Sequence, residues 1–115
     1  MIKIKRIYEK YSVDDGFRVL VDRLWPRGIS KPHSHVDLWL KEIAPTNDLR
    51  KWFSHDAAKW KSFEIKYRKE LQENKMLVET VKDLEKKHHT ITLLFSAKDE
   101  QHNNAIVLQR FMLDM

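Results

Sequence analysis

The segment TITLLFS at residues 90–96 is the sequence feature that most restricts which folds this chain can adopt. It is apolar, rich in β-branched residues and free of charged side chains. A strand of this kind is typical of a parallel sheet whose two faces are both covered. We therefore predict that this segment forms a central strand.

Two earlier segments alternate apolar and polar positions. Residues 2–8 place Ile2 and Ile4 on one face, and residues 17–23 do the same with Phe17, Val19 and Val21. A period of two predicts strands. Residues 37–44 are compatible with a short strand or a helical turn, and we favour the strand.

The helices are predicted from spacings of three and four. The strongest stripe lies within residues 57–74, a second helical pattern covers 77–89, and a last helix follows Asp99, its expected N-cap. Thr46 and Asp56 are expected to cap two further helical starts. Strands that lead into helices predict a small layered α/β open sheet, largely parallel, with helices packed on it. With 115 residues, we expect one domain over 1–115.

Composition excludes several classes of function. The chain has no Cys, which removes disulfides and thiol chemistry, and no apolar run long enough for a signal peptide or a membrane span. We therefore expect a cytoplasmic protein without membrane association. The net charge of +5, with its excess in the first third, favours anionic partners but lacks the clustered basic stripe of a dedicated nucleic-acid binder.

The first polar block is VDRLWPRGISK at residues 21–31. Two Pro and one Gly within 25–35 exclude a regular helix and predict a long loop. Arg23 and Arg27 offer planar forks for oxyanions, and Trp25 offers a face for stacking. The alternative is structural, with Asp22 pairing one Arg and Trp25 filling the core.

The second block, FSAKDEQHNNA at residues 95–105, joins the buried strand to the last helix. Ligands of open α/β sheets collect outside the carboxyl ends of the strands, so this loop is the first place to expect a site. Its donors predict an anion pocket. The candidate ligand-binding residues here are Ser96, Lys98, Asp99 and Asn103. The alternative is that Ser96 and Asp99 only cap the helix while Lys98 is solvated.

The third block, LRKWFSHD at residues 49–56, contains Arg50 as a ligand-binding candidate and His55 as a candidate proton shuttle. Histidine titrates near neutral pH, which suits acid–base catalysis, although such a residue often only caps a helix. His102 is the second catalytic candidate. The other His residues lack partners at metal-ligand spacing, so we predict no metal and no cofactor.

These blocks together resemble the YeaO-like branch of domain-of-unknown-function family 488, over nearly the whole chain. The resemblance implies functional positions at Arg23, Trp25, Pro26, Arg27, Gly28, Arg50, Trp52, Phe53, His55, Lys98, Asp99, His102 and Asn103. Other branches of the family have a Cys in the loop after the late strand. Here the loop has Ser96, which puts a thiol-based mechanism in doubt.

Three functions remain open. The first is a small enzyme or binding domain for an anionic small molecule that bears a phosphate or a carboxylate, with nucleotide-like molecules among the candidates. The second is nucleic-acid binding, suggested by the basic first third. The third is an interaction or homodimer module that uses the aromatic helix face of Trp60, Phe63 and Tyr67. The sequence leaves open whether the domain is an enzyme.

Overall fold

The structure, a computed structural model, describes all residues 1–115 and contains a four-stranded parallel sheet. The strands are β1 (Ile2–Arg6), β2 (Phe17–Leu20), β3 (Leu38–Trp39) and β4 (Ile91–Phe95). Their spatial order is β1-β4-β2-β3, and all paired strands are parallel. The predicted central strand at residues 90–96 is therefore confirmed, since β4 pairs with β1 on one side and with β2 on the other.

Helices make up most of the remaining regular structure. They are α1 (Lys31–Ser34), α2 (Asn47–Phe53), α3 (Trp60–Glu73), α4 (Lys75–His88) and α5 (Asn104–Leu113), with 3-10 turns at Val13–Asp15, Lys41–Ile43 and Ala57–Lys59. Thr46 caps α2 as predicted, because its Oγ1 accepts from the Leu49 N–H at 3.3 Å. Asp56 likewise caps the turn that leads into α3. None of these helices combines the length and the apolar character needed to cross a membrane.

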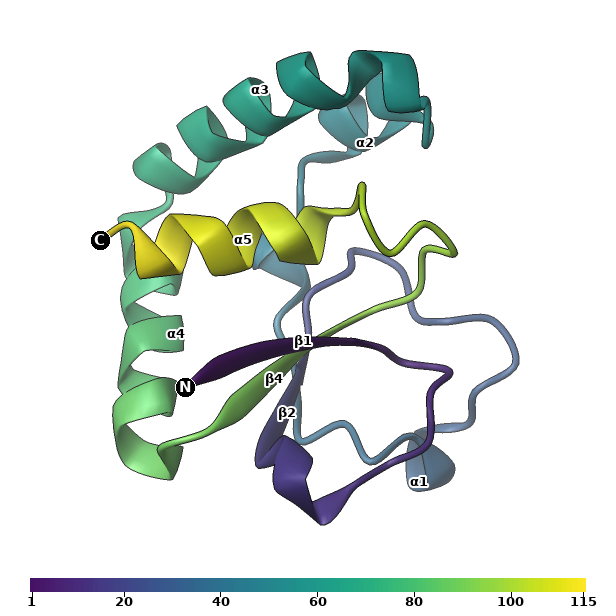
Figure 1. Ribbon diagram of the computed structural model, residues 1–115, viewed down its shortest axis with the longest axis vertical. Coiled ribbons are helices and arrows are strands. Elements are labelled where there is room, and N and C mark those ends of the chain that lie inside the picture. Colours follow the sequence, from purple (N-terminus) through teal and green to yellow (C-terminus); the bar gives the residue numbers. More distant parts are fainter.

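One face of the sheet packs against α4 and α5, with α3 on the outer side of α5 (Figure 1). The predicted alternation holds here, because Val19 and Val21 share this core with Leu93 and Phe95. The side-chain amide of Gln109 on α5 donates to the Ile2 carbonyl oxygen at 2.8 Å. Helix and sheet are thus joined by apolar packing and by a polar contact.

The predicted stripe of α3 faces this core. Phe63, Tyr67 and Leu71 are buried, and the Tyr67 hydroxyl donates to the Ile43 carbonyl oxygen at 2.7 Å. Trp60 is half-buried beside Phe63, with ring centroids 5.8 Å apart. The hypothesis that Trp60, Phe63 and Tyr67 present a partner surface is therefore wrong, because a stripe of this kind serves the interior of its own chain.

The opposite face of the sheet is covered by the long loop. Ile7, Leu20 and Leu94 are buried there against aromatic and aliphatic side chains of the loop and of β3. The loop departs from the prediction at one point, since α1 forms a helical turn within residues 25–35. Pro32 fits there because a first turn leaves its backbone N–H groups without helical partners.

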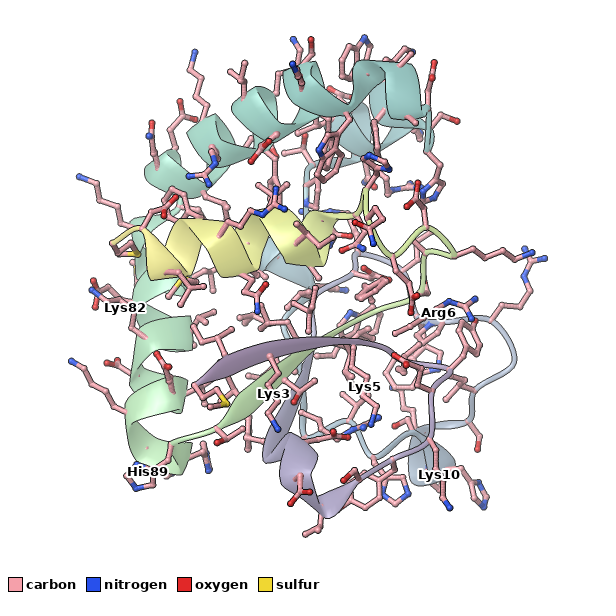
Figure 2. The ribbon with its side chains drawn as sticks, in the orientation of Figure 1. Lys3, Lys5, Arg6, Lys10, Lys82 and His89 are labelled. Atoms are coloured by element: carbon pink, nitrogen blue, oxygen red, sulfur yellow. The ribbon has the colours of Figure 1, made fainter.

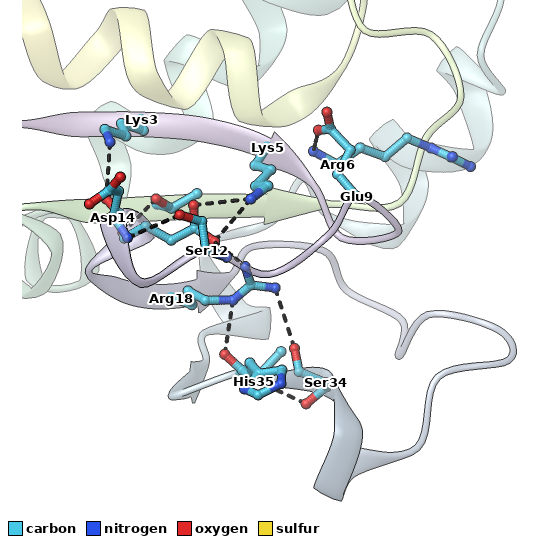
Figure 3. A network of polar contacts seen from close by, with 12 residues as sticks. Lys3, Lys5, Arg6, Glu9, Ser12, Asp14, Arg18, Ser34 and His35 are labelled. Carbon is cyan, nitrogen blue, oxygen red and sulfur yellow. Dashed lines mark hydrogen bonds and ion pairs between the residues drawn. The ribbon is translucent and has the colours of Figure 1, made fainter.

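A buried ion network fixes this loop to the sheet (Figure 3). The Arg18 guanidinium pairs with Asp15 and donates to the carbonyl oxygens of Ser34 and His35 at 3.4 and 3.0 Å. Lys5 donates to the same Asp15 carboxylate at 3.1 Å. Burial raises the pKa of Asp15, but hydrogen bonds from the Ser12 N–H, Lys5 and Arg18 outweigh it and leave the pKa lowered.

Candidate functional site

A pocket of about 720 Å³ opens where the strands end. Its walls come from Arg6 at the end of β1, from residues 22–27 after β2, from residues 50–55 except Trp52, from residues 96–98 after β4, and from Asn103 and Asn104. The carboxyl ends of parallel strands meet at one edge of a sheet, which is why segments so distant in sequence converge here.

The pocket unites most of the residues predicted from the three blocks. Those that line it are Arg23, Trp25, Arg27, Arg50, His55, Ser96, Lys98 and Asn103. Asp99 and His102 do not line it. The three polar blocks therefore meet in one pocket, except for Asp99 and His102 of the loop before the last helix.

Positive charge dominates the lining. The cationic side chains are Arg6, Arg23, Arg27, Arg50, Lys51 and Lys98, whereas Asp22 is the only carboxylate. Arg6 lies at the end of β1 beside the loop that follows β4 (Figure 2). An excess of this kind in a concave site attracts anions.

Two of these arginines also hold the walls in place. Arg6 Nε lies 3.1 Å from the Ala97 carbonyl oxygen, to which it donates. Arg23 donates to the carbonyl oxygens of Pro45 and Ala44 at 3.0 and 3.1 Å, and its Nη1 lies 3.5 Å from exposed Glu42. Carbonyl oxygens carry no net charge, so the contacts with them position the guanidinium groups without neutralising them. Only the contact of Arg23 with the exposed Glu42 carboxylate offsets part of one positive charge.

Other cationic side chains of the lining have N–H donors that no group of the chain uses. Arg27 and Lys98 are exposed, and their side chains form no hydrogen bond or ion pair within the chain. Arg50 donates from Nη2 to Asn47 at 3.3 Å, while its buried Nε has no partner. A buried N–H without a partner is costly, and a ligand in the pocket reaches this one only if the Arg50 side chain shifts.

Asp22 and Ser96 connect the ends of β2 and β4. Oδ2 of Asp22 accepts from the backbone N–H and from the hydroxyl of Ser96, both at 2.8 Å. Burial raises the pKa of Asp22, although donors on Ser96 and Asn104 and the nearby His55 oppose the rise. The Ser96 hydroxyl is therefore committed to the carboxylate, as a positioning contact.

His55 follows the C-terminus of α2 in a left-handed conformation. Ser54 and His55 have φ values of 45° and 57°, which turns the chain back at the rim of the pocket. The imidazole is exposed and forms no hydrogen bond in the chain, so no nucleophile is paired with it.

Asp99 and His102 form a separate pair. Asp99 Oδ2 lies 2.9 Å from His102 Nδ1, and this bond is the main cause of the lowered pKa of Asp99. The His102 ring also meets Trp60 edge to face, with centroids 5.1 Å apart. Both side chains are thus engaged with each other and with α3 outside the pocket.

The predicted cap of the last helix is wrong by four positions. Asn103 caps α5 by accepting from the Ile106 N–H at 3.0 Å, while Asp99 caps a turn of its own through the N–H groups of Gln101 and His102. Both ends of the buried Asn103 amide are used, since its Nδ2 donates to the Asp99 carbonyl oxygen at 3.1 Å. Asn103 therefore shapes the pocket wall rather than offering a free donor.

Trp25 lines the pocket and is held in place by two contacts. Its indole N–H donates to the Ile29 carbonyl oxygen at 2.6 Å, and its ring meets Trp39 edge to face at 5.4 Å. Sequence reasoning missed Arg6 and Lys51 as lining residues and treated Asp22 only as a partner for arginine. The position of Arg6 in the second half of the strand predicted at residues 2–8 was the one available signal, because parallel strands end at a common edge.

The family described as the inactive DUF488-N3 subclade matches residues 1–115. A similar protein is the "Uncharacterized protein YeaO" of Escherichia coli strain K12, which is 42% identical over 107 residues, covering 93% of this chain and 92% of that protein. The "Uncharacterized protein Rv3073c" of Mycobacterium tuberculosis strain H37Rv is 41% identical over 78 residues, which cover 68% of this chain and 66% of the mycobacterial protein. No solved structure matches the chain.

Proposed function

The chain belongs to the inactive DUF488-N3 subclade, and from that premise we propose that it is a non-catalytic protein that binds an anionic small molecule in the pocket at the strand ends. The anion is a phosphate or a carboxylate, since the guanidinium and ammonium groups of the lining match either one. The observation that carries the proposal is the lining itself, in which six Lys and Arg side chains face a single carboxylate.

The state of the individual donors supports binding. Arg27 and Lys98 are free to move toward a ligand, and Arg50 has a buried Nε without a partner. Arg6 and Arg23 are already held by carbonyl oxygens, so a ligand meets positive charge that needs no reorganisation. A volume of about 720 Å³ is in the usual range for small-molecule sites.

The polar groups also support binding without catalysis. The Ser96 hydroxyl donates to Asp22, and His55 has no hydrogen bond to any hydroxyl that it could activate. Nucleophilic catalysis needs a nucleophile and a base within hydrogen-bond reach. The chain has no Cys to act as a thiol nucleophile. These features agree with the word "inactive" in the family description.

Calorimetric titration with inorganic phosphate, pyrophosphate and citrate at low salt tests the proposal. We expect at least one to bind, and the Arg27→Ala and Lys98→Ala variants to bind it about 10- to 100-fold more weakly, as is typical for one charge-assisted hydrogen bond. Lys87→Ala is the matched control, because Lys87 is an exposed residue of α4 outside the pocket. Absence of binding by every anion, or equal loss in the Lys87→Ala variant, would contradict the proposal.

A further inference from the structure

We propose that the ligand carries a hydroxyl group beside its anionic group, and that Oδ1 of Asp22 accepts a hydrogen bond from this hydroxyl. The inference rests on the proposed function and names the class of ligand: a hydroxylated anion, such as a polyol phosphate or a hydroxycarboxylate. It starts from an anomaly in the pocket, which is the presence of a carboxylate among cations that would otherwise suit any anion.

The two oxygens of Asp22 differ. Oδ2 accepts both hydrogen bonds from Ser96, at 2.8 Å each, whereas Oδ1 accepts no hydrogen bond within 3.5 Å. The Asn104 amide lies close enough to oppose the rise in the pKa of Asp22, but its one hydrogen bond of ordinary length goes to the Val21 carbonyl oxygen at 2.9 Å. Arg50 Nε is the only fully buried side-chain nitrogen or oxygen without a partner. Because Oδ1 of Asp22 also has no partner, it is not fully buried, and it keeps access to the pocket that Asp22 lines. The pocket therefore contains one charged acceptor with an open position.

A bare anion gains nothing from this acceptor. Phosphate or a simple carboxylate would be repelled by Asp22 at short range, which partly cancels the attraction of the arginines. A hydroxyl on the same ligand reverses the effect, because hydrogen bonds to an ionised group are stronger than those between neutral groups. A site with such an acceptor also discriminates against analogues that lack the hydroxyl, since the acceptor is then desolvated without a partner.

The contacts with Ser96 keep the acceptor in position. They fix the carboxylate against the end of β4, so that Oδ1 is oriented by the chain before any ligand arrives. The free cations Arg27 and Lys98 belong to two other segments of the same lining. A ligand that meets these segments and Asp22 together must have its anionic group and its hydroxyl on one small framework.

Two matched pairs of compounds test the inference on the intact wild-type chain by calorimetry. Glycerol 3-phosphate is compared with propyl phosphate, and malate with succinate, so that hydroxyl content varies while the anionic group stays the same. We expect the hydroxylated member of the pair that binds to be preferred by about tenfold or more, the effect of one charge-assisted hydrogen bond. The pair that shows the preference identifies the anion as phosphate or carboxylate.

The Asp22→Asn variant then assigns the preference to this residue. Its amide oxygen can still accept from Ser96, while the charged acceptor is lost. We expect the preference to fall to about twofold or less and the compound without the hydroxyl to bind as tightly as before or more tightly. Asp83→Asn, at an exposed position of α4 outside the pocket, should retain the wild-type preference.

Equal affinities within both pairs in the wild-type chain would overturn the inference while leaving anion binding intact, and this comparison needs no variant to fold. A preference that persists in folded Asp22→Asn, verified by circular dichroism, would overturn the role of Asp22. Binding of none of the compounds, together with none of the simple anions, would overturn the proposed function as well. The failures of the two proposals are thus distinguishable.

Discussion

Arg18 and Asp15 form an ion pair in which both side chains are buried, three residues apart on either side of Gly16 and Phe17. The pair holds the loop that covers one face of the sheet, through the carbonyl oxygens of Ser34 and His35. Loss of one member of a buried pair leaves an uncompensated charge in the interior. We therefore expect Asp15→Asn to lower the free energy of unfolding by about 3–5 kcal/mol in urea denaturation at neutral pH.

The effect of Asp15 should also depend on pH. Because its pKa is lowered in the folded state, its stabilisation is complete above its ordinary pKa of 3.8 and is lost as the pH falls through the lower folded value. The difference between wild type and Asp15→Asn should accordingly shrink in strong acid. An equal difference at neutral pH and below about pH 2 would argue against a charge effect. Asp83→Asn serves as the exposed control.

Tyr67→Phe tests the polar contact inside the main core. The Tyr67 hydroxyl is fully buried and donates to Ile43, so its removal leaves a carbonyl oxygen without a partner. We expect a loss of about 1–3 kcal/mol in the free energy of unfolding, measured in urea. Tyr11→Phe, at an exposed position, should change it by less than about 0.5 kcal/mol. Similar losses in both variants would mean that the buried contact contributes little.

The two glycines offer a matched test of backbone strain. Gly16 has φ 66°, and a Cβ there would lie 2.2 Å from the Thr90 carbonyl oxygen. Gly28 has φ 80° but nothing within 4 Å of the corresponding position. We expect Gly28→Ala to cost about 1–2 kcal/mol, for the backbone conformation alone, and Gly16→Ala to cost clearly more. Thermal denaturation ranks the two, and equal melting temperatures would refute the contribution of the Thr90 contact.

The stability of Asp22→Asn relative to wild type should improve as the pH rises. Burial raises the pKa of Asp22 in the folded state, so the folded protein binds this proton more tightly than the unfolded chain. The cost of burying the charge is absent below the ordinary value of 3.8 and complete above the raised folded value, and the variant avoids it. Urea midpoints of both proteins across this range measure the change, and a difference that does not vary with pH would contradict it.

Much of the fold could be predicted because it rests on periodicity. The spacing of Phe63, Tyr67 and Leu71 required a helix with one buried face, and the uncharged run before Ser96 required a covered strand. Residues 37–44 show the limit. A two-residue strand and a 3-10 turn share that apolar run, and the boundary depends on the pairing of Leu38 with Val19. Local sequence carries little information on such a long-range contact.

The location of the candidate site was predictable, but the state of its side chains was not. Strand ends converge by topology, so the blocks containing Arg27, Arg50 and Lys98 could be expected to meet. That Arg23 is held by Pro45 while Arg27 is free follows from the path of a segment 22 residues away. The alternative reading of the late loop was correct in part, since Lys98 is exposed and unpaired, whereas the cap belongs to Asn103.

The position of β4 between β1 and β2 has a consequence for synthesis on the ribosome. The first two strands do not pair with each other: β1 pairs only with Ile91–Phe95, and β2 pairs with the two-residue β3 on one side and with Ile91–Phe95 on the other. A nascent chain therefore keeps β1 without a partner and one edge of β2 unpaired until residues 91–95 emerge. Contacts over such separations form slowly, and open edges invite association with other chains. The order of the strands thus makes completion of the sheet wait for the synthesis of β4.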